Sequence, residues 1–163
     1  MNKINKKQLY GQIINQLETV YQGALDAAKR AHETATDEEN EAENKYDTLG
    51  LEAAYLAEGQ SKRVIECEND LNEFKSLLKN EHIQNNAVVV GSLVHLRDDD
   101  DRPMTVFIGP AAGGLTTTVH NIKIIVITSS SPLCKALIGK EKDDVGILTF
   151  DNKQTHFVIE AIE

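Results

Sequence analysis

Residues 121–150 read NIKIIVITSSSPLCKALIGKEKDDVGILTF, and this stretch contains the pattern of a strand, a short helix and a second strand. Its two ends are apolar runs rich in Ile and Val, the composition expected of strands. Between them, Ser131 stands where a helix N-cap is expected and Pro132 takes the first helical position. Gly139 follows the helical residues Leu133–Ile138, as glycine does at the position after a helix end. A short helix between strands predicts an α+β fold.

The β-branched composition extends over residues 83–163, which we expect to form one antiparallel sheet domain. Three more strands are expected at residues 87–96 (AVVVGSLVHL), 105–109 (TVFIG) and 155–162 (THFVIEAI). The four consecutive acids Asp98–Asp101 lack the alternating ligands and the glycine of a calcium-binding loop. We interpret them as a solvated hairpin turn.

Residues 1–82 have a different pattern, because they contain no proline and their apolar residues recur at spacings of three and four. Such spacing is typical of the contact stripe of a coiled coil. We predict an antiparallel two-helix hairpin, with helices at about 6–33 and 37–79. Thr36 and Glu39 have the spacing of a capping box at the start of the second helix. The residues of the two stripes are Tyr10, Ile13, Leu17, Val20, Ala24, Ala27 and Ala31, and Val64, Cys67, Leu71, Phe74 and Leu78.

The expected tip of this hairpin, near residues 33–47, is acidic. Its carboxylates belong to Glu33, Asp37, Glu38, Glu39, Glu41, Glu43 and Asp47. Clustered carboxylates can help to hold Mg²⁺, which takes one or two protein carboxylates together with waters and phosphates. Acids in the first turn of a helix also stabilise it through the helix dipole. The residues alone leave both interpretations open.

Composition excludes several classes of protein. The formal net charge of −9 disfavours direct binding to nucleic acid and favours a protein partner with a basic surface. The two cysteines, Cys67 and Cys134, lack the spacing of a zinc site, so we expect reduced thiols in the cytoplasm. The apolar runs are too short for a membrane span, and no signal peptide is expected.

Residues 87–163 resemble the C-terminal, FKBP-like domain of the Gre family of bacterial transcript-cleavage factors. The segments VVVGSLVHL, TVFIG, SSSPLCKALIGKEKDDVGIL and FVIEAI come in the family's order, and the SP…ALIGKE…DDV stretch is the most specific. The N-terminal part is similar to the family's coiled coil through Glu43-Asn44 with Tyr46 and through RVIECENDL at residues 63–71. A related family, the regulators of nucleoside diphosphate kinase, has a shorter hairpin, and the long helices expected here favour the Gre side.

The resemblance implies a monomeric transcription elongation factor that binds RNA polymerase and meets nucleic acid only within that complex. The sheet domain would dock on the rim of the polymerase secondary channel, and the hairpin would enter the channel. The chain would not be an enzyme by itself, because the polymerase supplies the active site. The partner-binding residues implied are Ser131, Pro132, Leu137, Ile138, Gly139, Lys140 and Glu141.

The resemblance also implies a role for the acidic tip in the cleavage of backtracked RNA. Glu39, Glu41 and Glu43 would assist the metal chemistry. A Mg²⁺ ion shared with the polymerase, and not bound by the chain alone, would involve Asp37, Glu38, Glu39 and Glu43. The position of the family's catalytic aspartate falls on Asn40, and this departure favours an alternative, a non-cleaving regulator that occupies the same channel.

Two remoter alternatives belong to other classes. FKBP-like domains include prolyl isomerases, which need an aromatic-lined pocket. Beyond residue 80 the aromatic residues Phe107, Phe150 and Phe157 are few for such a pocket, which disfavours a folding helper. A coiled-coil adaptor without a role in transcription is the last alternative.

Overall fold

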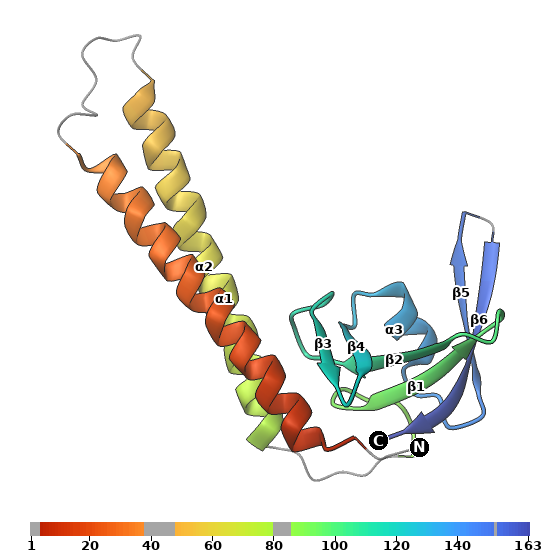
Figure 1. Cartoon of the computed structure of the whole chain (residues 1–163). Coiled ribbons are helices and arrows are strands. Elements are labelled where there is room, and N and C mark those ends of the chain that lie inside the picture. The colour runs from red at the N-terminus through yellow and green to blue at the C-terminus, as the bar shows by residue number, and fades with distance from the viewer. Residues whose placement is uncertain (1–3, 38–47, 80–85, 152) are drawn as a thin grey trace. The chain divides into compact units, whose positions relative to one another are not determined.

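A computed structural model describes residues 4–37, 48–79, 86–151 and 153–163 of the chain (Figure 1). These residues form two compact units. One unit comprises Ile14–Asn72, and the other comprises Met1–Ile13 together with Glu73–Glu163. The elements in chain order are α1 (Lys6–Ala35), α2 (Leu49–Lys79), β1 (Leu93–Asp98), β2 (Pro103–Ile108), β3 (Thr116–Val119), β4 (Ile122–Ile127), α3 (Pro132–Leu137), β5 (Val145–Phe150) and β6 (Lys153–Ile162).

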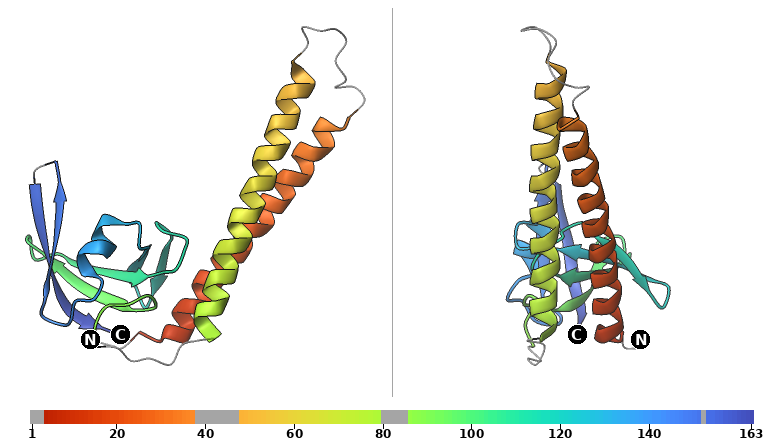
Figure 2. Two further views of the ribbon diagram at one scale, coloured as in Figure 1. Left: turned by 180° about the vertical axis from the view of Figure 1, so that it is seen from behind. Right: turned by 90° about the vertical axis from the view of Figure 1, so that its left-hand side faces the viewer.

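The helices α1 and α2 lie side by side and run in opposite directions, as the views of Figures 1 and 2 agree. The first helix was expected at residues 6–33 and ends two residues later, within the usual uncertainty of a helix end. The expected antiparallel pairing of two long helices is confirmed. The side chains buried along the hairpin unit are those of Leu17, Ala24, Ala31, Cys67 and Leu71.

The contact stripe differs from the prediction at two positions. Val20 is 45% exposed and Leu78 is also exposed, whereas their neighbours Tyr21 and Leu77 are half-buried. Tyr21 lies four residues after the buried Leu17, and Leu77 lies three residues after the buried Phe74, so the stripe passes through Tyr21 and Leu77. The apolar character of Val20 and Leu78 therefore did not identify the face on which they lie.

The predicted start of the second helix at Asp37 is wrong, because α2 begins at Leu49. The Thr36 amide and hydroxyl both donate to the His32 carbonyl oxygen, at 3.0 and 2.9 Å, so Thr36 terminates α1 instead of capping α2. The residue before α2 is Thr48, whose carbonyl oxygen accepts the first helical hydrogen bond from the Glu52 amide. The Thr48 hydroxyl also donates to the Glu52 carboxylate.

The six strands form one sheet in the order β3-β4-β2-β1-β6-β5. The prediction of an antiparallel sheet is wrong for one pair, because β2 and β4 are parallel. The prediction also missed β3, a four-residue strand of sequence TTTV. This strand forms a hairpin with β4 and reverses the chain, so that β4 enters beside β2 in the parallel direction. The expected hairpin turn at Asp98–Asp101 is confirmed between the antiparallel strands β1 and β2.

The bases of the two long helices belong to the same compact unit as the sheet. The Tyr10 and Phe107 rings meet edge to face at a centroid distance of 5.5 Å, and the Phe74 and Phe107 rings lie 6.2 Å apart. All three side chains are fully buried. The Lys6 ammonium also donates to the Gly91 carbonyl oxygen at 3.0 Å. The boundary predicted between residues 82 and 83 stays a prediction, but part of the core of this unit comes from residues before it.

Candidate functional site

The described ends of the hairpin contain two of the predicted tip acids. Glu33 lies in the last turn of α1, exposed and 4.0 Å from the Lys29 ammonium, and Asp37 follows the helix. Glu38, Glu39, Asn40, Glu41, Glu43 and Asp47 lie outside the described residues. Within the described part of the chain, no group of three acidic, histidine or cysteine side chains is arranged to hold a metal ion. The metal-assisting role of the tip therefore remains a prediction.

The second predicted site surrounds α3, where Ser131 and Pro132 take the expected N-cap and first-turn positions. The Ser131 side chain makes no capping hydrogen bond. Its amide instead donates to the Thr128 carbonyl oxygen at 2.8 Å, which closes the turn after β4. Gly139 follows the helix with a φ of +77°, a left-handed conformation that favours glycine. The positions predicted for Ser131, Pro132 and Gly139 at the ends of this helix are confirmed, although the Ser131 hydroxyl does not cap it.

The segment after α3 is fixed to the sheet unit by backbone hydrogen bonds. The Gly139 amide donates to the Val88 carbonyl oxygen at 2.8 Å, and the Val88 amide donates to that of Lys140 at 2.8 Å. The Glu141 amide donates to the Asp144 carboxylate at 2.8 Å. These three hydrogen bonds leave the segment few alternative conformations, so its exposed side chains are held in place.

Asp143 and Asp144 form an irregularity where the chain enters β5. The Asp143 amide donates to the Ile159 carbonyl oxygen, and the Ile159 amide donates to that of Asp144. Two residues thus oppose one, and Asp143 has a φ of +71°. This arrangement is a G1-type β-bulge, with aspartate at a position that glycine usually occupies. The bulge sets the register of the β5–β6 hairpin that follows.

The predicted partner-binding residues divide into surface and core. Leu137 is fully buried and belongs to the core with Val88, Val106 and Ile159, so its role is to hold α3 against the sheet. Pro132, Ile138, Gly139 and Glu141 are exposed, and Ser131 and Lys140 are half-buried. Ile138 is the large apolar side chain among them, with 45% of its surface exposed.

Sequence reasoning missed a group of exposed apolar residues beside this segment, namely Val145, Ile147 and Val158. Val145 lies opposite Val158 in the β5–β6 register, and Ile147 lies opposite His156. These side chains share one face, because alternate residues of a strand do. The run VGILTF is apolar on both faces of the strand, so its sequence could not indicate which residues face the solvent.

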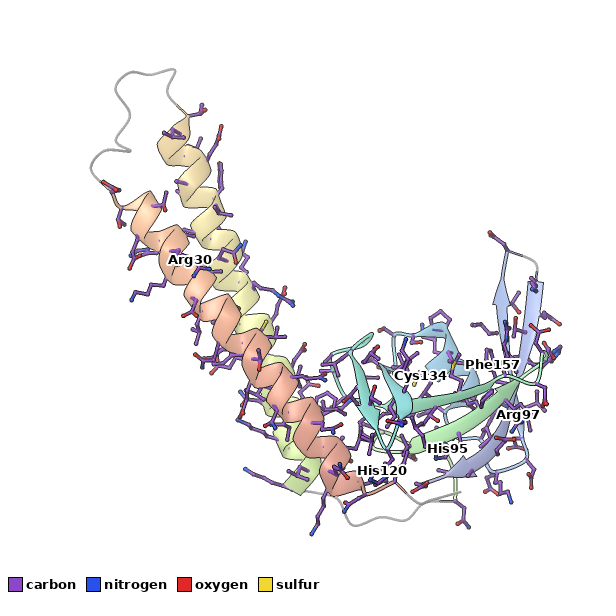
Figure 3. The ribbon with its side chains drawn as sticks, viewed as in Figure 1. Arg30, His95, Arg97, His120, Cys134 and Phe157 are labelled. Atoms are coloured by element: carbon purple, nitrogen blue, oxygen red, sulfur yellow. The ribbon has the colours of Figure 1, made fainter. Side chains whose placement is uncertain are left out.

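Charged and polar side chains stabilise the central strands, and Figure 3 labels two of them, His95 and Arg97, on β1. The buried His95 ring lies 3.1 Å from the Thr105 hydroxyl and 3.2 Å from the Glu163 carboxylate. Arg97 donates through Nε to Glu160 at 2.6 Å. These groups tie β1 to β2 and to the end of β6, which accounts for their positions without a catalytic role.

The two cysteines are free and buried, Cys67 in the hairpin and Cys134 in α3. Burial raises the pKa of the Cys134 thiol, because the thiolate would lose its hydration. Such a thiol is a poor nucleophile at neutral pH. No described helix is long and apolar enough to cross a membrane.

No protein-family model matches the chain, and no curated protein matches it. Three solved structures are similar to it over nearly its whole length. GreA factor homologue 1 (Gfh1) of Thermus thermophilus is 19% identical, with a TM-score of 0.37, over 99% of this chain and 96% of that chain. Gfh1 of Thermus aquaticus is 23% identical, with a TM-score of 0.38, over 94% and 93%. A further structure of the transcription factor Gfh1 is 22% identical, with a TM-score of 0.41, over 94% and 92%.

Proposed function

We propose that this chain binds RNA polymerase as a secondary-channel regulator, with the sheet unit docking on the polymerase and the hairpin acting in the channel. The observation that carries the proposal is the segment at residues 131–148. It combines the SP…ALIGKE…DDV sequence of the Gre family with a helix–bulge–strand structure, in which Pro132 and Gly139 stand at the two ends of α3 and Asp143 and Asp144 form the bulge. The polymerase supplies the active site in this proposal, and the chain acts as an accessory factor.

The docking surface in this proposal consists of the exposed side chains around the end of α3. Ile138 is exposed, and Lys140 and Glu141 follow it on the segment that is hydrogen-bonded to Val88. An exposed apolar side chain on an ordered backbone, with charged residues close by in the chain, has the composition of an interface centre and its rim. Residues that are already ordered lose little entropy on binding.

A variant pair tests this surface. Ile138→Glu should weaken binding to core RNA polymerase by tenfold or more, which is about 1.4 kcal/mol. Val90→Glu is the matched control, because Val90 is also 45% exposed and lies in the same unit. It should bind as the wild type does. Equal losses in both variants, measured by fluorescence anisotropy with labelled protein, would contradict the assignment of the surface to α3.

The proposed role of the hairpin depends on charge. The chain is acidic overall, so its hairpin suits a basic channel better than it suits free nucleic acid. Carboxylates of the kind predicted at the tip, Glu39 and Glu43 among them, are suitable Mg²⁺ ligands. They would supplement the ligands that the polymerase provides.

Two candidates fit this proposal. The first is a factor that stimulates cleavage of backtracked RNA, and the second is a non-cleaving regulator, which Asn40 favours. An amide cannot ionise, so it is a weaker Mg²⁺ ligand than the carboxylate that the family resemblance would place there. Such a protein would occupy the same channel and compete with a cleavage factor without stimulating cleavage. The two candidates share the docking surface and differ only in the chemistry of the tip.

A transcript-cleavage assay on a stalled, backtracked elongation complex separates the candidates. If the wild type stimulates cleavage, Glu39→Gln with Glu43→Gln should abolish that stimulation and leave polymerase affinity nearly unchanged, because orientation of the water at the metal is lost. If the wild type only competes with a cleavage factor, the second candidate is correct, and Asn40→Asp should then introduce measurable cleavage. A wild type that neither stimulates nor competes would refute the proposed function.

A further inference from the structure

The two edges of the sheet are not equally protected. β3 and β5 are the edge strands, and within the described residues β5 pairs with β6 alone (Figure 1). β3 has only four residues, and the side chains it exposes are those of Thr116 and Thr118. Short, polar edge strands are one way in which proteins prevent unwanted strand pairing. β5 has six residues and contains neither a charged residue nor proline.

The bulge at Asp143–Asp144 determines which backbone groups of β5 face the free edge. Ile159 exchanges both of its hydrogen bonds with the bulge, so the next pair, Val145 and Val158, is a non-hydrogen-bonded pair. Hydrogen-bonded and non-hydrogen-bonded pairs alternate along an antiparallel ladder. The amide and carbonyl groups of Val145, Ile147 and Thr149 therefore point away from β6. None of them has a backbone partner elsewhere in the described chain.

The side chains of the same residues form an apolar face. Val145 is 40% exposed and Ile147 is 49% exposed, whereas Gly146 on the other face packs against α3. An added strand would thus find three pairs of unsatisfied backbone groups and, beside them, two exposed apolar side chains. This is the combination that peptide-binding sheet edges offer, with affinity from the backbone and selectivity from alternate side chains.

We propose that the free edge of β5 binds an extended segment of a partner protein by antiparallel strand addition. The segment would have apolar residues at alternate positions, opposite Val145, Ile147 and Thr149. Basic residues would flank it, because the exposed carboxylates of Asp143 and Asp144 precede β5 and that of Asp151 follows it directly. Lys142 directly precedes Asp143, and Lys153 stands two positions after Asp151, so the attraction is local to the strand ends.

A second copy of this chain is the less suitable occupant. Antiparallel pairing of two β5 strands would bring Asp143 and Asp144 of one copy beside Asp151 of the other, and like charges opposite each other destabilise a strand pair. Each copy also has a net charge of −9, which opposes association at low ionic strength. A partner segment with basic ends avoids both costs.

The direct test uses the full-length protein and a labelled peptide, Lys-Lys-Val-Ser-Val-Ser-Val-Lys-Lys, without polymerase. Two N-methylated versions provide the matched comparison. Methylation of the three valine amides blocks the hydrogen bonds that face β5, whereas methylation of the two serine amides affects groups that face the solvent. Valine methylation should weaken binding by at least about tenfold, since three hydrogen bonds to β5 are lost. Serine methylation should change affinity by less than about twofold.

Protein variants and amide exchange provide the second measurement. Ile147→Pro removes one outward amide and leaves the ladder to β6 intact, as edge strands permit, so it should abolish binding. Val158→Lys adds a charge to the same face on the interior strand β6 and should weaken binding far less. On binding of the unmodified peptide, the amides of Val145, Ile147 and Thr149 should become protected from hydrogen exchange.

Three results would overturn the proposal. The first is no saturable binding of the unmodified peptide, and the second is equal weakening by the two methylated peptides, which would indicate binding to the apolar face without strand addition. The third is a dimer, detected by sedimentation, that Ile147→Pro dissociates, because the occupant would then be a second copy. None of these assays contains polymerase, so their failure is distinct from a failure of the proposed function.

Discussion

The two compact units bury their side chains to different extents. The unit that contains the sheet fully buries large side chains, among them Tyr10, Phe74 and Phe107. The buried side chains of the described hairpin unit are Leu17, Ala24, Ala31, Cys67 and Leu71, and each of them keeps some exposed surface. The first turns of α2 also expose Leu51, Tyr55 and Leu56. Burial of large apolar area is the main stabilising term in folding. The difference therefore predicts that the sheet unit determines global stability and that the hairpin unit opens locally at lower cost.

Phe107 gives the largest expected effect, because its ring is the common neighbour of Tyr10 and Phe74. Phe107→Ala should lower the free energy of unfolding by about 3–5 kcal/mol. A double-mutant cycle with Tyr10→Ala should give a coupling energy of about 0.5–1.5 kcal/mol. Urea unfolding measures both quantities. A coupling of zero would show that the helix base does not belong to the core of the sheet unit.

The same contacts bear on the predicted boundary between residues 82 and 83. A fragment of residues 84–163 lacks Tyr10 and Phe74, so one side of the Phe107 ring would meet water. We expect this fragment to fold but to melt at a lower temperature than the sheet transition of the full chain. Equal melting temperatures, measured by calorimetry, would support separable units with the boundary as predicted.

Leu71 tests the hairpin side of the comparison, because it is 6% exposed and lies in the contact stripe of α2. Leu71→Ala should destabilise the hairpin unit by about 2 kcal/mol, at the lower end of the range for such substitutions, since the site borders solvent. Hydrogen exchange should accelerate in residues 14–72 and stay unchanged in β1, β2 and β4. Acceleration in both units together would mean that the chain unfolds as a single cooperative block.

Two glycines should respond with opposite signs. A Cβ atom at Gly109 would lie 2.6 Å from Val126 Cγ1 and 3.1 Å from the Phe74 ring, so Gly109→Ala should cost about 1–3 kcal/mol. A Cβ atom at Gly59 in α2 would contact nothing within 4 Å. Gly59→Ala should therefore stabilise the helix by about 0.5–1 kcal/mol. Thermal unfolding of the two variants would contradict the comparison if both shifts had the same sign.

The sequence predicted those elements whose signals are local. The helix at residues 132–137 has proline at its start and glycine after its end, and the turn at Asp98–Asp101 has side chains that bond their own backbone. β3 was missed because four residues are too few for a periodic signal, and the parallel pairing of β2 with β4 depends on that strand. Thr36 was misassigned because a threonine can cap either helix, and only the observed bonds to His32 distinguish the two.

The candidate site was also predictable only where its signals were local. The segment around α3 was located by its sequence, but the exposed face of β5 was not, since a run of apolar residues on both faces conceals which one meets solvent. Leu137 was assigned to partner binding and lies in the core, because the motif cannot separate residues that position a surface from residues that form it.

Replacement of a titrating carboxyl group gives the smallest expected effect. The melting temperature at neutral pH should fall in one unit and rise in the other. In the sheet unit, the hydrogen bond from the Arg102 side chain lowers the pKa of Asp98. A carboxyl with a lowered folded pKa stabilises the protein above its unfolded pKa, and the contribution is lost as pH falls through the folded pKa. Asp98→Asn should therefore lower the melting temperature at neutral pH, and its difference from the wild type should shrink as the solution is acidified.

In the hairpin unit, partial burial raises the pKa of Asp70, with a smaller opposing effect of Arg63. A carboxyl with a raised folded pKa destabilises the protein once it ionises, so the hairpin should lose stability as pH rises through the unfolded and then the folded pKa. Asp70→Asn should raise the melting temperature at neutral pH, and this gain should vanish in acid. Asp98→Asn provides the comparison, because its expected shift at neutral pH has the opposite sign. Circular dichroism of the helical signal from about pH 3 to about pH 7 covers both carboxyl groups. If Asp70→Asn lowers the melting temperature at neutral pH, its carboxylate is stabilised by Arg63 more than it is destabilised by burial, and the opposite response of the two units is refuted.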